Sequence, residues 1–197
     1  MQFETIDEQI KQAILILEKN KDLMDVLNFI CELNLPNFYI AAGSVFQTIW
    51  NYYDNRPLNY GIKDIDVIYY NKDDLSVDTD IKYYNLINDY CIKQGYNYEI
   101  DVSNEARMHL WKKEKFNITV EQYKNSEDAI NKWIATVHAI GITKEKNYLK
   151  IYAPYGLSDI YSRTIRPIKH KDNTKEIYDK KAKSWNERFD NLNIIEW

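Results

Sequence analysis

Cysteine and long apolar runs are both scarce in this sequence of 197 residues. Cys31 and Cys91 are too few for a disulfide framework, so we interpret them as small buried residues of a reduced, cytosolic protein. No run of about 18 apolar residues occurs, and we therefore expect no membrane-spanning helix. The start of the chain carries Glu4, Asp7 and Glu8 and lacks the basic-then-apolar pattern of a secretory signal, which favours a cytoplasmic location.

Glycine and proline are also few, at five and four residues. No repeat, low-complexity tract or flexible linker is visible, so we expect one domain over residues 1–197. Its expected parts are a helical lead-in at about 5–34, a core at about 38–167 and a C-terminal helix at about 174–190. The net charge of −4 argues against a protein dedicated to binding duplex DNA.

Charge is distributed unevenly along the chain. The segment from Asp64 to Asp101 holds nine acidic and three basic residues, whereas the segment from Arg163 to Arg188 holds nine basic and four acidic residues. This pattern is compatible with a cation site beside an anion site. It is equally compatible with two solvated faces of opposite sign.

Hydrophobic spacing predicts an alternation of helices and short strands. Helices are expected over 6–17, 23–30, 45–52 and 81–91, from a cap at Ser126 to about residue 137, and along a C-terminal apolar stripe at 178–192. Strands are expected over 38–42, 64–70 and 98–102, with a hairpin formed by 140–143 and 148–153. This order predicts an α+β fold in which helices flank a small mixed β-sheet.

Two acids stand in the second of these predicted strands. Asp64 and Asp66 are two positions apart, which places both carboxylates on one strand face, roughly 6.6 Å apart along the chain. Like charges in this arrangement repel each other unless water or a cation separates them. Asp101 lies in the next predicted strand, and if the two strands pair, three carboxylates converge. Such a set suits Mg²⁺, and a pair of these ions could clamp the attacking and leaving oxygens of a phosphoryl transfer.

Gly43 and Ser44 follow the first predicted strand and open a helix. Glycine permits close approach of a phosphate to the backbone, and a helix N-terminus offers free N–H groups and the positive end of a dipole. Ser44 adds a hydroxyl. Taken alone, a Gly-Ser pair is usually only a helix start, and an isolated Asp-x-Asp is more often a solvated strand edge. Their order along the chain, followed by the third acid, favours nucleotidyl transfer.

With these residues the chain resembles the DNA polymerase β-type nucleotidyltransferase superfamily, which shows Gly-Ser, then Asp-x-Asp, then a later strand carboxylate. More closely, it is similar to a small bacterial family of nucleotidyltransferase-like proteins of undefined substrate. The matching stretches lie at 39–45, 50–51, 62–67, 101–109, 126–130, 149–157 and 166–167.

The resemblance implies a small mixed sheet with the acids on two adjacent strands. It also implies Asp64, Asp66 and Asp101 as catalytic metal ligands for Mg²⁺ or Mn²⁺, and Gly43 with Ser44 as the contact for the phosphates of a nucleoside triphosphate. One departure is Phe46, which stands where the family commonly has a basic residue and removes one candidate phosphate contact.

Further polar residues follow the third acid. Arg107 is a candidate phosphate contact, and His109 could line the pocket. The alternative is that Asn104 caps a turn and Arg107 pairs with one of the many acids. Arg163 and Arg166 could meet a nucleotide or acceptor, or be ordinary surface bases.

Three functions are compatible with this pattern. The first is an Mg²⁺-dependent nucleotidyltransferase that passes a nucleoside monophosphate from a triphosphate to an unidentified acceptor. The second is a non-catalytic descendant that binds a nucleotide or a partner. The third is a toxin-like enzyme that modifies RNA or protein, with the basic C-terminal stretch as the acceptor surface. The acid trio favours the first.

Overall fold

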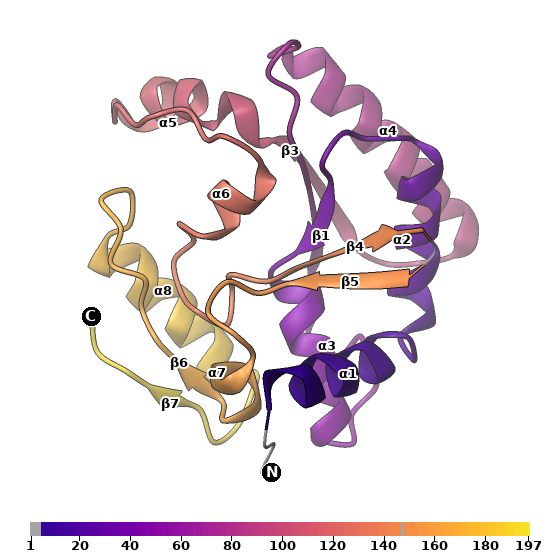
Figure 1. The fold of residues 1–197 in the computed structure, drawn as a ribbon, viewed down its shortest axis with the longest axis vertical. Helices are drawn as coiled ribbons and strands as arrows, with labels where there is room; N and C mark the ends of the chain where they lie inside the picture. The colour runs from indigo at the N-terminus through magenta and orange to yellow at the C-terminus, as the bar shows by residue number, and fades with distance from the viewer. Residues whose placement is uncertain (1–4, 147) are drawn as a thin grey trace.

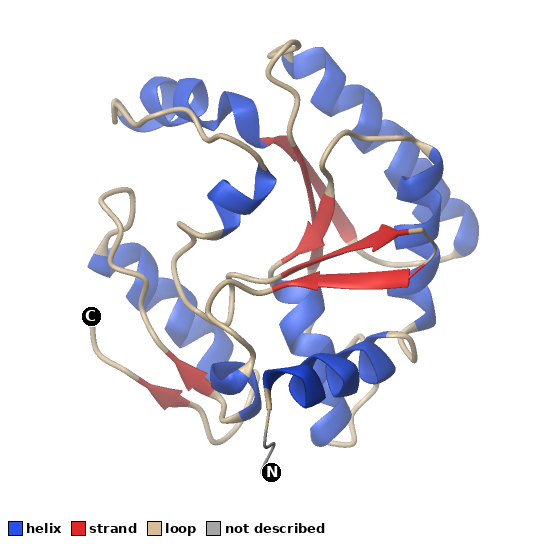
Figure 2. Cartoon of the chain, viewed as in Figure 1, coloured by secondary structure: helices blue, strands red, loops and turns tan. Residues whose placement is uncertain are grey.

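The computed structural model describes residues 5–146 and 148–197. Its helices are α1 (Ile6–Leu17), α2 (Lys21–Glu32), α3 (Gly43–Tyr53), α4 (Val77–Gln94), α5 (Met108–Phe116), α6 (Ser126–Ile130), α7 (Ser158–Tyr161) and α8 (Lys175–Asn186), with a 3₁₀ turn η1 (Glu105–Arg107). Its strands are β1 (Tyr39–Ala41), β2 (Asp64–Tyr69), β3 (Glu99–Asn104), β4 (Gly141–Glu145), β5 (Tyr148–Tyr152), β6 (Thr164–Ile165) and β7 (Asn193–Ile194). The prediction of an α+β fold with a mixed sheet is confirmed (Figure 2).

Five strands form the main sheet in the order β3-β2-β1-β4-β5. The β2–β3 pair is parallel, whereas the other three pairs are antiparallel. Parallel neighbours need a crossover connection, and α4 supplies it between β2 and β3. In Figure 1, α2 and α4 lie on one side of this sheet, and α5, α6 and α8 lie on the other. The strands β6 and β7 form a separate parallel pair.

Local sequence explains where several helices begin and end. Thr5 and Glu8 form a capping box at the start of α1, in which each side chain accepts from the other's backbone N–H. Helix α4 ends at Gly95, which adopts the left-handed conformation (φ 77°) that glycine tolerates. The acids of its first turn, Asp78 and Asp80, lie at the positive end of the helix dipole.

One large cluster of buried apolar residues joins α1, α2 and α3 to the sheet and to α8. Both cysteines are free; Cys91 is buried in this core and Cys31 is half-buried. Trp50 of α3 is fully buried and its indole N–H donates to the carbonyl of Ile160, which ties α3 to α7. None of the described helices is both long enough and apolar enough to cross a bilayer.

The predicted helix from Ser126 to about residue 137 is wrong in its length and its cap. Helix α6 ends at Ile130, and its N-cap is Asn125, whose side chain accepts from the N–H of Asp128. Ser126 instead donates its hydroxyl to the carbonyl of Asn37. Further along, the carbonyl of Ile134 accepts from the N–H of Ile168, and the N–H of Thr136 donates to the carbonyl of Arg166. These long-range bonds replace the helical ones.

The C-terminal stripe is also shorter as a helix than predicted. Helix α8 ends at Asn186, although Phe189 beyond it is buried in the same core. Helices α5 and α7 and the pair β6–β7 were not predicted. Each of them is either short or without a clear apolar face, so hydrophobic spacing gives no signal for it.

Candidate functional site

The parallel pairing of β2 with β3 brings the predicted acids to one face of the sheet. Asp66 is the direct register partner of Asp101, and Asp64 lies opposite Glu99. Burial, together with the charges of Asp64 and Asp101, raises the pKa of Asp66 to about 7, while Lys181 opposes the rise. Burial and Asp64 likewise raise the pKa of Asp101. The three carboxylates therefore act on one another as a cluster of like charge.

The Gly43–Ser44 corner stands beside this cluster. Ala41 at the end of β1 pairs with Asp66, and Ala42 then turns the chain into α3 with a positive φ of 56°. A Cβ atom placed on Gly43 would lie 2.8 Å from the Gln47 amide nitrogen and 3.9 Å from an oxygen of Asp64. Helix α3 begins without a side-chain cap. Since Gly43 is its first residue, the positive end of the helix dipole lies close to Asp64.

The Ser44 side chain is bonded inside the corner. Its side chain is almost fully buried, and its hydroxyl donates to the carbonyl of Ala41 over 3.3 Å. The Ser44 carbonyl accepts from the Thr48 hydroxyl at 2.7 Å. The Ser44 hydroxyl is therefore bonded within the protein.

A cavity of about 800 Å³ opens over the acid face. Asp66 and Asp101 line one wall, η1 and α5 line a second, and α8 with the segment around His138 lines a third. Val77, Ile81 and Tyr84 of α4 form an apolar edge. Asp64, Gly43 and Ser44 are not among the described residues that line this cavity.

Arg107 lies in the cavity wall and is 3.5 Å from Asp80. Asp80 also accepts from the hydroxyl of Tyr69 and the N–H of Asn104. Asn104 caps η1 by accepting from the N–H of Ala106. These contacts match the alternative in which Asn104 is a cap and Arg107 is an ion-pair partner.

Three further predicted residues lie apart from the cavity. His109 is not among its described lining residues. Arg163 pairs with Asp54, and Arg166 pairs with Asp159 at 3.1 Å. The structure therefore gives Arg163 and Arg166 partners within the protein.

The cavity contains ionisable residues that sequence reasoning missed. Glu105 is buried, and burial raises the pKa of its carboxyl to about 8, with Lys112 acting against the rise and Asp101 adding to it. Lys181 of α8 is 3.1 Å from His138. Lys181 follows Tyr178 by three positions, which places it beside the apolar stripe of the predicted helix. This spacing could have marked Lys181 as a candidate site residue. No spacing or motif in the sequence predicted that Glu105 would be a buried residue of the cavity.

The acid face fits a divalent cation by its donor chemistry. In residues 5–146 and 148–197, no group of three or more His, Cys, Asp or Glu side chains is drawn together tightly enough to form a ready metal cluster. Nevertheless, Asp64, Asp66 and Asp101 offer only carboxylate oxygens, and their mutual repulsion is what raises the pKa of Asp66 beyond the effect of burial. Hard oxygen donors of this kind suit Mg²⁺ or Mn²⁺.

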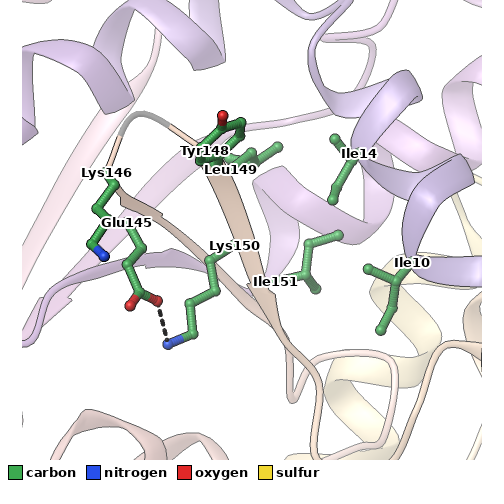
Figure 3. Close-up of a pocket in the computed structure, with 8 residues that line it drawn as sticks. All are labelled: Ile10, Ile14, Glu145, Lys146, Tyr148, Leu149, Lys150 and Ile151. Atoms are coloured by element: carbon green, nitrogen blue, oxygen red, sulfur yellow. Dashed lines mark hydrogen bonds and ion pairs between the residues drawn. The ribbon is translucent and has the colours of Figure 1, made fainter. Parts of the chain in front are cut away.

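A smaller hollow of about 400 Å³ lies between α1 and the β4–β5 hairpin (Figure 3). Ile10 and Ile14 of α1 face Ile151 across it. Its charged residues include Glu145 and Lys150, which neutralise each other at 3.1 Å. Glu145 is the one carboxylate among the described residues that line this hollow.

A sequence family described as "Nucleotidyltransferase" matches residues 28–194. The chain is similar to a solved structure described as "The NMR structure of the protein reveals a CCA-adding enzyme head domain", with a TM-score of 0.79, 25% identity and coverage of 95% of this chain and 96% of that chain. A second structure, "Structure of tRNA-processing enzyme complex 3", has 14% identity and a TM-score of 0.38, covers 71% of this chain and 35% of that one, and carries no argument. The curated proteins contain no match to this chain.

Proposed function

The chain belongs to the nucleotidyltransferase family, and from that premise we propose that it passes a nucleoside monophosphate from a nucleoside triphosphate to an acceptor hydroxyl. The acceptor oxygen forms a bond to the α-phosphorus, the bond from that phosphorus to the bridging oxygen breaks, and pyrophosphate leaves. The observation that carries the proposal is the register of β2 and β3, which sets Asp66 directly beside Asp101 on the wall of the large cavity.

Asp64, Asp66 and Asp101 would hold Mg²⁺ or Mn²⁺, which when bound neutralises phosphate charge and favours the deprotonated acceptor. In this arrangement Asp101, on the strand beside Asp66, is also the carboxylate that would accept the proton of the acceptor hydroxyl. Asp66 gains from the cation as well, since a bound cation removes the repulsion that it experiences from its neighbours.

The Gly43 corner would receive the leaving phosphates. Gly43 has no side chain to displace the Gln47 amide, whose nitrogen lies 2.8 Å from where a Cβ atom would stand, and the uncapped start of α3 supplies a positive dipole end near Asp64. Ser44 is almost fully buried and its hydroxyl donates to the carbonyl of Ala41, so it would hold the corner in shape. Arg107 would assist from the cavity wall while sharing its charge with Asp80.

The test is incubation of the protein with labelled triphosphates, Mg²⁺ or Mn²⁺ and a cell extract separated into RNA, protein and small molecules. The likeness to a CCA-adding enzyme head domain makes the 3′ hydroxyl of RNA the first acceptor to examine. The proposal is supported if the wild type transfers label and Asp66→Asn does not. Asp89→Asn, on the exposed face of α4, is the control and should transfer label as the wild type does. Triphosphate binding without transfer to any fraction would instead indicate a binding protein.

A further inference from the structure

We infer that Lys181 of α8 binds the phosphates of the nucleoside triphosphate in the large cavity, an inference that rests on the proposed function. Helix α3 contains no basic residue of its own, so the corner at its start has a dipole but no cation from that helix. A triphosphate carries several negative charges, and a site that holds it needs positive groups besides the metal.

Lys181 has a neutral partner. Its ammonium lies 3.1 Å from Nε2 of His138, and burial together with Lys181 keeps the pKa of His138 well below its ordinary value. The imidazole is therefore uncharged, and Nε2 accepts a hydrogen bond from the ammonium. This contact holds the lysine in place without cancelling its charge.

Within the described part of the chain, no carboxylate lies within ion-pair distance of Lys181. The other cations that line the cavity differ in this respect. Lys112 pairs with Asp172 at 3.2 Å, and Lys132 pairs with Asp128 at 3.0 Å. Arg107, as described above, pairs with Asp80. Lys181 is thus the cavity cation whose charge is left for a ligand.

Its position matches that role. Lys181 of α8 and Asp66 of β2 line the same cavity from different walls. An anion between the two walls would face cations held by the acids on one side and the ammonium on the other. This geometry binds phosphate oxygens, whereas an uncharged acceptor would gain little from it.

The experiment measures binding directly by calorimetry, in Mg²⁺, with ATP, GTP, CTP and UTP, inorganic tripolyphosphate and adenosine as probes. Lys181→Gln should weaken triphosphate and tripolyphosphate binding about tenfold, and Lys181→Arg should restore most of it. Adenosine binding should be unchanged. Lys183→Gln, two positions along α8 and exposed, is the matched control and should bind as the wild type does.

Each other outcome is informative. Triphosphate binding equal in Lys181→Gln and the wild type would overturn the inference while leaving the proposed function standing. Loss of adenosine binding to the same extent would show that the lysine acts on the shape of the cavity, and would also overturn it. A wild-type protein that binds none of the triphosphates would remove both the inference and the proposed function.

Discussion

Phe46 of α3 meets Trp185 of α8 edge to face, with ring centroids 5.5 Å apart and the ring planes at 85°. Phe46 also packs against Trp50 at 4.8 Å, and Trp50 packs against Phe189 at 5.1 Å. This aromatic row fixes α8 against α3. The wall that carries Lys181 is therefore held at a set distance from the strands that carry the acids.

Phe46→Ala should lower the free energy of unfolding by about 3–5 kcal/mol, because it deletes a fully buried ring and leaves a cavity. Chemical denaturation measures the change. Phe46→Leu keeps most of the buried apolar volume and should lose less than the alanine variant. A loss below about 1 kcal/mol for Phe46→Ala would contradict the importance of this row for the attachment of α8.

Asp66→Asn should abolish function while making the fold more stable. It removes a charge whose pKa is raised from 3.8 to about 7, so at pH 8 we expect a gain of up to about 4 kcal/mol in unfolding free energy. Transfer activity should fall by at least about a hundredfold, because mutating even residues that only hydrogen-bond to metal ligands lowers activity by up to about that factor. Thermal melting and labelled-nucleotide transfer are the two measurements. Asp89→Asn should alter neither, and an active Asp66→Asn variant would refute the site assignment.

Glu105 should make stability depend on pH. Its carboxyl has a pKa of about 8 in the folded protein against an ordinary 4.5, so the folded state binds this proton more tightly than the unfolded state. The resulting stability is fully present below pH 4.5 and is lost as the pH rises through 8. Between these values the contribution falls by up to about 1.4 kcal/mol per pH unit.

Glu105→Gln removes this titration. Denaturation at pH 5.5, 7 and 8.5 should give a shallower decline for the glutamine variant than for the wild type, and the variant should be the more stable of the two at pH 8.5. Parallel stability curves for the two proteins would contradict the raised pKa of Glu105.

Asn104 is a buried centre of hydrogen bonding between β3 and the loop after β2. Its side-chain oxygen accepts from the N–H groups of Asn71 and Ala106, and its amide donates to the carbonyls of Asn71 and Asp74 at 2.8 Å each. Asn104→Ala should destabilise the protein by about 2–4 kcal/mol, since buried backbone groups lose their partners. Hydrogen exchange should increase first at residues 71 and 106. Unchanged protection there would argue against this role.

Much of the fold could be predicted because its signals are local. The Gly-Ser corner, the strand with Asp64 and Asp66, and the β4–β5 hairpin each follow from residues near one another in the chain. The resemblance to the polymerase β-type nucleotidyltransferases is confirmed by the family match over residues 28–194 and by the structural likeness. The meeting of Asp66 with Asp101 was expected only on the condition that their strands pair, and the pairing is present.

The remainder depends on contacts between distant segments. Helix α6 is short because the chain beyond it bonds to residues 166–168, which no local pattern reveals. Lys181 faces the cavity because the aromatic row orients α8, and the ion pairs of Arg107 and Lys112 depend on how α4, α5 and the loop at 172 come together. The sequence shows which basic residues are present, but it does not show which of their side chains lacks a carboxylate partner in the fold.

The crossover through α4 has a consequence for how the protein acquires its activity during folding. Asp66 and Asp101 lie 35 positions apart, and they become neighbours only when a long loop has closed and a parallel strand pair has formed. Such non-local pairings form slowly compared with helices and hairpins. During denaturation, activity should thus be lost before helix content falls. During refolding, activity should return after the helices have formed.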